Sequence, residues 1–322
     1  MKMRNNMVSI VIPNYNGIEF IANCLQSLQN QSFENYEIIV VDNASSDRST
    51  MYIKEKFPEV KLIELDKNYG FSKAVNEGIK QSASKYVILL NNDTTVDEYF
   101  VEELVKVMEE SKQIFSCQAK MLQMYDSSRI DDAGDYYCSL GWAFARGKGK
   151  SSLLYQENAK IFAACAGAAI YRREVFDQIG YFDEAHFAYL EDIDIGYRAR
   201  IHGYKNRYAA KSVVYHAGSG SSGSRYNEFK VDLASRNSIF LIYKNMPFLQ
   251  ILLNLPFLLI GFIIKIMFFS KKGFGKTYLL GLKKGIQMAI KLEKVEFHIK
   301  NMGNYASIQF ELWINTIRRF VY

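Results

Sequence analysis

Proline, cysteine and tryptophan are scarce in this sequence. Only 4 of its 322 residues are proline, while 49% are hydrophobic. So little proline excludes long disordered tracts, and a chain of this length and hydrophobicity can bury a large core as one domain or two. The cysteines form no CxxC pair and have apolar or small neighbours; they are Cys24, Cys117, Cys138 and Cys165. We therefore expect structural thiols in a reducing compartment.

A long apolar run is missing near the N-terminus, where only residues 8–12 are uninterrupted before Pro13. This run is too short for the apolar region of a signal peptide, so we expect the protein on the cytosolic side of the membrane. A strong excess of one charge is missing as well. The net charge of +6 argues only weakly for a polyanionic partner or a membrane surface, and we expect no nucleic-acid partner.

Strand and helix patterns alternate over the first hundred residues. Apolar strands separated by helices are typical of a parallel sheet covered on both faces, so we expect a doubly wound α/β fold. The expected strands are 8–13, 36–45, 60–66 and 85–93, and the expected helices are 17–31, 48–57, 70–82 and 97–111. Ligands bind at the carboxyl ends of such strands. The polar loops that should meet there are 13–16, 42–45, 66–70 and 91–93.

The middle of the chain, from about 112 to 240, indicates mixed α and β structure with longer loops. Residues 131–150 are glycine-rich and predict a hairpin or a flexible loop. Residues 161–204 predict a strand of small residues, a short helix, a loop and a second helix. The Gly/Ser tract that ends the segment 205–226 should be mobile.

Three polar side chains, Asn91, Asn92 and Asp93, follow the fourth apolar strand. They are common turn formers, but a carboxylate at this edge could also hold a metal ion that carries a phosphate. Asp42 ends the second strand and could accept N–H groups of a base or ribose hydroxyls. An Asx turn or a helix cap is the alternative, although Asp47 is the better candidate for the cap.

Four segments occur along the chain in this order: "VSIVIPNYNG", "IIVVDNASSD", "NYGFSKAVNEG" and "VILLNNDT". Together they resemble glycosyltransferase family 2, over about residues 7 to 240. The resemblance implies a GT-A fold and transfer of a sugar from a nucleotide donor with inversion. The segments "AGAAIYRREVFDQIGYFDE" and "YLEDIDIGYRAR" resemble the rhamnosyltransferase-like branch of that family.

The resemblance also implies roles for individual nucleotide-binding residues. Asp42 would read the pyrimidine, and Pro13 and Tyr15 would line its pocket. Asn68 and Gly70 would lie beside the nucleotide, at the beginning of a helix whose free backbone N–H groups favour phosphate or a ring carbonyl.

The expected metal site lies at the loop 91–93. In the family this loop is usually Asp-x-Asp, whereas here Asn91 takes the place of the first carboxylate. Asn92 and Asp93 are expected at the nucleotide, and Asp93 is expected to bind Mg²⁺ or Mn²⁺, since one or two carboxylates with phosphate oxygens and water suffice. His216 matches the family histidine that completes the site, and imidazole suits Mn²⁺ better than Mg²⁺. A structural histidine is the alternative.

An inverting transfer needs a carboxylate that takes the proton of the acceptor hydroxyl. Glu191, Asp192 and Asp194 stand at the start of an expected helix. The resemblance assigns the base to Asp192, with Glu191 as the alternative and Asp194 as structural. Acids are favoured at helix N-termini in any case, and the helix dipole would lower the pKa of a base there. Arg236 could neutralise the leaving diphosphate or form a surface salt bridge.

The chain changes character after residue 240, and we expect a catalytic domain at 1–240 and a membrane-associating helical region at 241–322. Residues 245–264 contain no charge and are interrupted by prolines and a glycine, and residues 271–294 carry seven lysines and one acid. We expect broken helices in the headgroup layer on the cytoplasmic face of the plasma membrane, peripheral or monotopic. A spanning helix and a buried core or dimer helix are alternatives.

The expected function is transfer of L-rhamnose from dTDP-rhamnose to a hydroxyl of a lipid-linked saccharide in cell-surface polysaccharide synthesis. Other donors remain open, such as a UDP- or dTDP-linked galactofuranose or N-acetylhexosamine. A nucleotidyltransferase should have a glycine-rich loop with Lys or Arg after the first strand, and "PNYNG" is not such a loop. A catalytically impaired nucleotide-binding membrane scaffold is a further alternative.

Overall fold

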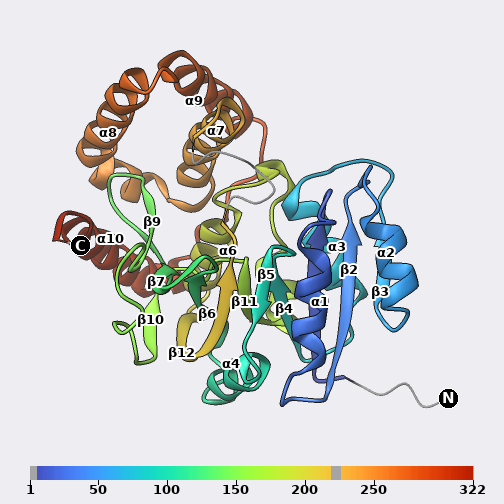
Figure 1. Cartoon of the computed structure of the whole chain (residues 1–322). Coiled ribbons are helices and arrows are strands. Elements are labelled where there is room, and N and C mark those ends of the chain that lie inside the picture. Colours follow the sequence, from blue (N-terminus) through green and yellow to red (C-terminus); the bar gives the residue numbers. More distant parts are fainter. Residues whose placement is uncertain (1–5, 219–225, 322) are drawn as a thin grey trace.

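The computed structural model describes residues 6–218 and 226–321. In this part of the chain a ten-stranded sheet runs through the molecule, with a group of helices at one end (Figure 1). The predicted α/β class is confirmed. The Gly/Ser tract that we expect to be mobile falls mainly on residues outside the described ranges.

Four parallel strands form one half of the sheet, in the order β4-β1-β2-β3. Val8 lies opposite both Tyr36 and Tyr86, so β1 lies between β2 and β4. The strands are β1 (Val8–Asn14), β2 (Tyr36–Asp42), β3 (Lys61–Glu64) and β4 (Tyr86–Leu90). The helices that follow them are α1 (Ile21–Gln29), α2 (Ser49–Lys56), α3 (Phe71–Gln81) and α4 (Phe100–Glu109).

Both faces of this sheet are buried, as the continuous apolar strands predict. On one face Ile88 of β4 packs in a core with Leu25 of α1 and Leu104 of α4. On the other face Leu89 packs with Val75 of α3 and with Phe176. The alternation of neighbouring β4 residues between two cores explains why this strand contains no polar residue.

The other half of the sheet is mixed in direction. β11 runs antiparallel between β4 and β6, and β12 runs parallel to β6. β5 pairs with β12 so that His216 lies opposite Thr94, which brings the end of β12 to the loop after β4. The strands are β5 (Thr94–Val96), β6 (Ile114–Gln123), β7 (Asp126–Asp132), β10 (Ala159–Ile161), β11 (Ala168–Arg172) and β12 (Lys205–His216).

The glycine-rich stretch 131–150 contains the predicted hairpin. β8 (Asp135–Tyr137) and β9 (Ala143–Ala145) pair antiparallel within it. Two helices and a 3₁₀ turn complete the segment 161–204 in the predicted order: α5 (Arg173–Ile179), η1 (Glu184–His186) and α6 (Glu191–Ile201). The four cysteines are free, and burial raises the pKa of the Cys24 thiol to about 12, in agreement with structural thiols.

The C-terminal helices pack against the residues that precede them in the chain. Tyr197 of α6, Leu241 of α7 and Leu312 of α10 are buried in a third core. The expected boundary at residue 240 lies inside α7, and the side-chain amide of Asn315 donates to the carbonyl of Tyr137 at 2.9 Å. The helices are α7 (Glu228–Asn245), α8 (Phe248–Lys271), α9 (Gly275–Ala289), η2 (Ile299–Asn301) and α10 (Met302–Val321).

The prediction of broken helices after residue 245 is wrong. α8 is one continuous helix. Pro247 stands at its N-cap, and Pro256 lies near its middle without ending it. At the N-cap a backbone N–H would have no partner within the helix, so Pro247 costs no hydrogen bond there. Pro256 removes one backbone hydrogen bond, and the helix tolerates this loss. By length and composition α8 could cross a membrane, and 17% of its most apolar window is buried.

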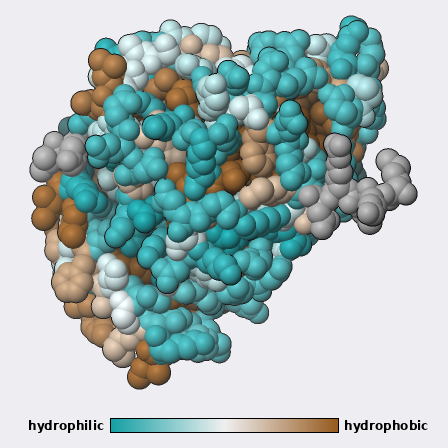
Figure 2. All heavy atoms as spheres, turned by 90° about the horizontal axis from the view of Figure 1, so that it is seen from below, coloured by the Kyte–Doolittle hydropathy of each residue, from teal (hydrophilic) through white to brown (hydrophobic). Residues whose placement is uncertain are grey.

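The outer surface of α8 is apolar and exposed, so α8 is not a core helix of the described chain. Figure 2 shows hydrophobic side chains gathered on the left-hand side of the molecule, the side on which α8 and α10 lie in Figure 1, beside a mainly hydrophilic face. Exposed apolar residues of α8 include Phe248, Leu249, Leu252, Leu253, Ile260, Ile263 and Met267. Such a patch is typical of an interaction or membrane surface.

Candidate active site

A cavity of about 1130 Å³ opens at the carboxyl ends of β1 and β4. All four polar loops reach it, as the sequence predicts. Nine of the expected site residues line it: Pro13, Tyr15, Asn68, Gly70, Asn92, Asp93, Glu191, Asp192 and His216. The side facing α6 is closed by the loop 187–190.

Asp42 is expected at the pyrimidine, but its carboxylate does not line this cavity. Asp42 is 2% exposed and accepts hydrogen bonds from the Asn14 amide at 2.7 Å and from the backbone N–H and hydroxyl of Ser45 at 2.8 and 2.6 Å. The Asn14 side chain then accepts from the Asn92 amide at 2.8 Å. Asp42 therefore forms the Asx turn that we considered as the alternative, and it orients Asn14 and Asn92, which do line the cavity.

Arg236 lies outside the cavity lining as well. Its guanidinium donates to the carbonyls of Ala185 and His186 at 3.0 and 2.7 Å. The neighbouring Asn237 amide donates to the carbonyl of Tyr189 at 2.8 Å. Arg236 thus forms no salt bridge among the described residues and does not line the cavity. Together with Asn237 it holds the loop that closes the cavity.

That loop is strained. Phe187, Tyr189 and Leu190 have φ values of 63°, 71° and 68°, a left-handed conformation that costs about 1–2 kcal/mol for each side chain. Gly70, at the start of α3, lies against the same loop: a Cβ on Gly70 would come within 2.5 Å of the Phe187 carbonyl oxygen. Gly70 also has φ +85°, so only glycine fits there without strain.

Asp93 and His216 form the candidate metal site. The His216 Nε2 atom lies 3.3 Å from Asp93 Oδ1, and the Nδ1 atom lies 2.8 Å from Asp131 Oδ2. Although burial favours the neutral imidazole, the hydrogen bonds to Asp131 and Asp93 raise the pKa of His216 to about 9. At neutral pH and without an ion the imidazole is therefore protonated on both nitrogens, and it donates from Nδ1 to Asp131 and from Nε2 to Asp93. A divalent cation between Nε2 and Asp93 would take the place of the Nε2 proton.

The donor set fits a divalent ion. Two neighbouring ligands of an octahedral ion with bonds of about 2.1 Å lie about 3 Å apart, close to the observed separation of Asp93 and His216. A carboxylate that binds the second nitrogen of a metal-ligating histidine fixes its tautomer and orientation, and Asp131 is placed to do so. The sequence prediction did not include Asp131.

Glu191 and Asp192 begin α6 and line the cavity. Burial raises the pKa of Asp192 to about 6, although hydrogen bonds from the Ile193 N–H and from Asp135 oppose the shift. Burial and the Asp192 charge raise the pKa of Glu191 to about 8. The expected lowering by the helix dipole is therefore outweighed by desolvation, which favours a carboxylate that can accept a proton near neutral pH.

Asp194 has a structural role. It accepts from Arg198 at 2.8 Å and from Lys244 at 3.1 Å, and its side chain is fully buried. It is absent from the cavity lining, unlike Glu191 and Asp192, because it lies on the inner face of α6 against α7.

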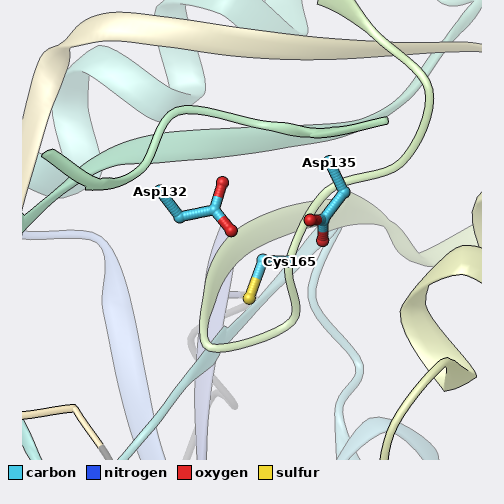
Figure 3. Close-up of side chains that lie close together, drawn as sticks. All are labelled: Asp132, Asp135 and Cys165. Carbon is cyan, nitrogen blue, oxygen red and sulfur yellow. The ribbon is translucent and has the colours of Figure 1, made fainter. Parts of the chain in front are cut away.

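A second acidic group lies beside Asp192 and was missed in the sequence. Asp132, Asp135 and Cys165 face one another (Figure 3), with their ligand atoms within 4.8 Å. Burial raises the pKa of Asp132 to about 6 and that of Asp135 well above its usual value. Asp135 and Cys165 line the cavity. The cluster of acids in "DDAGD" (131–135) could have indicated this group, but the glycine-rich pattern led us to read the segment only as a hairpin or loop.

The sequence matches the family model "Glycosyl transferase family 2" over residues 9–180. The chain is 28% identical to "Uncharacterized glycosyltransferase YwdF" of Bacillus subtilis (strain 168) over 219 residues, 65% of this chain and 73% of that protein. It is 33% identical to "Poly-beta-1,6-N-acetyl-D-glucosamine synthase" of Staphylococcus epidermidis over 105 residues, 31% of this chain. That match spans 26% of the synthase.

The fold is similar to that of S. aureus TarS 1-349 in complex with UDP-GlcNAc. The TM-score is 0.61 at 19% identity, and the match covers 87% of this chain and 80% of that one. The likeness supports the GT-A architecture. Since the family model covers more than half of the chain and the cavity lies where that architecture binds its ligands, this protein belongs to glycosyltransferase family 2.

Proposed function

We propose that this protein is an inverting glycosyltransferase that moves a sugar from a nucleotide-sugar donor to an acceptor hydroxyl. The observation that carries the proposal is that the carboxylate of Asp192 and the Asp93–His216 pair line one cavity. An inverting transfer requires both a proton acceptor for the incoming hydroxyl and charge neutralisation for the leaving diphosphate.

The donor nucleotide binds along the carboxyl ends of β1 and β4. Tyr15 is 44% exposed at the cavity, so its ring is free to stack on a base. Asn68 and Gly70 stand at the beginning of α3, where free backbone N–H groups favour a phosphate. Asp42 acts indirectly here, because it fixes Asn14 through its 2.7 Å hydrogen bond.

Asp93 and His216 would hold Mg²⁺ or Mn²⁺, and Asp131 would orient the imidazole. The ion, when bound, supplies positive charge for the diphosphate of the donor. Asn91 removes one carboxylate from the usual ligand set, so we expect the ion to bind weakly without the donor, whose phosphate oxygens complete the coordination.

Asp192 takes the proton of the acceptor hydroxyl. The hydroxyl oxygen forms a bond to the anomeric carbon, the bond from that carbon to the diphosphate breaks, and the nucleotide diphosphate leaves from the opposite face with the electron pair. The configuration at that carbon is therefore inverted. Asp135 donates a hydrogen bond to Asp192 and holds its carboxylate in place.

Two classes of donor have support. Residues 166–200 resemble the rhamnosyltransferase-like branch, which favours dTDP-L-rhamnose. The TarS structure with UDP-GlcNAc and the poly-N-acetylglucosamine synthase relative favour a UDP-N-acetylhexosamine. UDP-galactofuranose is a third candidate. The acceptor in this proposal is a lipid-linked saccharide of a cell-surface polysaccharide, reached from the cytoplasmic face of the membrane through the exposed apolar surface of α8.

A donor panel tests this proposal. Purified protein with Mn²⁺ or Mg²⁺ is incubated with dTDP-L-rhamnose, UDP-N-acetylglucosamine or UDP-galactofuranose, and the thermal shift and the release of nucleotide diphosphate are measured. We expect one donor to raise the melting temperature and to be hydrolysed slowly by water. A donor that binds without any turnover, with or without acceptor, would favour the catalytically impaired scaffold instead.

A further inference from the structure

A second cavity, of about 1550 Å³, lies between the β8–β9 hairpin and the helices α8 and α10. Figure 1 shows β9 and α10 side by side at this edge of the molecule. The second cavity adjoins the first, because Phe144 and Lys265 line both. A ligand in the second cavity therefore lies next to the site that contains Asp192.

Among residues 6–218 and 226–321, seven cationic side chains and no carboxylate line the second cavity. Lys265 of α8 and Arg318 and Arg319 of α10 have no acidic partner within 4 Å among residues 6–218 and 226–321. The loss of hydration on burial lowers the pKa of Lys265 to about 8. This concentration of positive charge in a concave site favours a polyanionic ligand.

Aromatic rings hold these three cations in place. The Lys265 Nζ atom lies 5.8 Å from the centre of the Trp142 ring, and the Arg319 guanidinium lies 5.6 Å from the centre of the Phe144 ring. Arg318 lies 5.1 Å from the Tyr136 ring centre. A cation stacked on a ring loses little further freedom when it binds an anion, so the charges are positioned in advance.

The hairpin is fixed to α8. The Trp142 indole N–H donates to the carbonyl of Gly261 at 3.2 Å. A Cβ on Gly261 would come within 2.2 Å of the Leu140 carbonyl oxygen, so the close approach of hairpin and helix requires glycine here. The cavity between them is therefore built into the fold.

One wall of the cavity joins the apolar surface of the molecule. Ile264 and Phe268 of α8 and Phe320 of α10 line the cavity and are also exposed, Phe320 by 70%. The same two helices thus present cations to the inside of the cavity and apolar side chains to the outside. A ligand with an anionic head and an apolar tail matches this arrangement.

We propose that the second cavity binds the diphosphate group of a membrane-anchored acceptor. The lipid tail of the acceptor leaves along α8 and α10, and its saccharide extends past Phe144 and Lys265 toward Asp192. Guanidinium groups pair well with phosphate oxygens, which gives Arg318 and Arg319 the main contacts. This inference rests on the proposed function, and it names the chemistry by which the acceptor is recognised.

Binding of farnesyl diphosphate to the full chain, measured by calorimetry without any donor, tests the inference. Lys265→Gln and Arg319→Gln should each weaken binding about tenfold, because each removes a charge-assisted hydrogen bond. Lys272→Gln removes the same charge from an exposed position at the end of α8, outside the cavity, and should change the affinity by less than about twofold. Lys265 has no ion pair with any residue of the described part of the chain, and the melting temperature of each variant verifies that it folds.

Inorganic diphosphate and farnesol serve as comparison probes, and both should bind more weakly than farnesyl diphosphate. Equal affinity for inorganic diphosphate would mean a site for free diphosphate and would overturn the inference, as would equal affinity for farnesol. Tighter binding of a soluble polyphosphate, lost in the same variants, would assign the cavity to an anionic polymer instead. Donor hydrolysis in the unmodified protein is measured separately, so a failure of this site is distinguished from a failure of the proposed function.

Discussion

The Nε2 atom of His216 lies 3.3 Å from Oδ1 of Asp93, although the two residues are 123 positions apart in the sequence. The pairing of β12 with β5 produces this contact, since it sets His216 opposite Thr94. Asp131 on the other side of the imidazole fixes which nitrogen faces the cavity. The three residues together constitute the candidate metal site.

The first prediction concerns this site. His216→Ala should weaken Mn²⁺ binding in the presence of donor about 10- to 100-fold, and Asp93→Ala should abolish it, because each removes a ligand. His298→Ala is a matched control, since His298 is exposed and forms an ion pair with the exposed Glu296 at 3.5 Å. The measurement is a titration of Mn²⁺ by electron paramagnetic resonance. Equal Mn²⁺ affinity in all three variants would remove the metal role from these residues.

The second prediction concerns stability and pH. Burial alone would raise the pKa of Asp194, but the charges of Arg198 and Lys244 hold this pKa far below its usual range. Because this pKa is lowered in the folded state, the stabilisation is present above the unfolded pKa of about 4 and is lost as the pH falls below it. Asp194→Ala should therefore cost about 3–5 kcal/mol at pH 7, since it leaves buried cations unpaired, and less at pH 3.

Asp177→Ala is the control for Asp194→Ala. Asp177 is 56% exposed and lies 3.9 Å from Arg173, so its loss should cost less than about 1 kcal/mol. Urea denaturation at pH 7 and pH 3 gives both values. A cost for Asp194→Ala that does not change with pH would show that the ion pair is not the source of the stabilisation.

The third prediction concerns the contact between α3 and the strained loop. Gly70→Ala must adopt φ +85° and also displaces the Phe187 carbonyl. Gly149→Ala has a similar φ of +76° with nothing within 4 Å of the added Cβ, so it should cost only about 1–2 kcal/mol. Gly70→Ala should cost more and should weaken donor binding as well. Thermal unfolding and donor affinity measure the two effects, and equal costs for the two variants would contradict the role of the Phe187 contact.

The fourth prediction concerns the membrane. Replacement of Leu249, Ile260 and Met267 by Gln removes exposed apolar area from α8 and should abolish co-flotation with anionic liposomes. The control replaces Met51, Tyr125 and Leu153, which are exposed elsewhere, and should float like the unmodified protein. Salt should weaken flotation without eliminating it, because apolar burial is not screened. Flotation that persists in alkaline carbonate would indicate a spanning helix instead.

The parallel half of the fold could be predicted from the sequence because its signals are local. β1, β2 and β4 contain apolar runs, β3 has two apolar residues between two charged ones, and a helix follows each of them. Short-range periodicity identifies these elements. The antiparallel position of β11 between β4 and β6 has no local signal, because the order of strands depends on long-range packing. The continuity of α8 through Pro256 was missed because sequence rules treat an internal proline as a helix end. In α8 the helix continues past the proline, which removes one backbone hydrogen bond.

The candidate site could be predicted in part. Asp93 was indicated by its place at a strand end, and the family resemblance implied Asp192 and His216. The structure brings all three to one cavity. The partners Asp131 and Asp135 could not be predicted, since a hairpin far away in the sequence carries them to His216 and Asp192. The burial of the Asp42 side chain away from the cavity could not be predicted either. Its Asx turn with Ser45 and its bond to Asn14 compete with any ligand for the same oxygens.

The central claim is that Asp192 accepts the proton of the acceptor hydroxyl in this cavity. Asp192→Asn keeps the shape of the side chain and removes its basicity, so it should reduce the rate of sugar transfer by about 10²–10⁴-fold while donor affinity stays near that of the unmodified protein. Because burial raises the pKa of Asp192 to about 6, transfer by the unmodified protein should decline as the pH falls below about 6. The most direct measurement is kcat for transfer of a labelled sugar to a lipid-linked acceptor, from pH 4.5 to 8.5, in the unmodified protein, Asp192→Asn and Glu191→Gln. The account predicts an inactive Asp192→Asn and an acidic limb near pH 6; an active Asp192→Asn beside an inactive Glu191→Gln would contradict it and assign the base to Glu191.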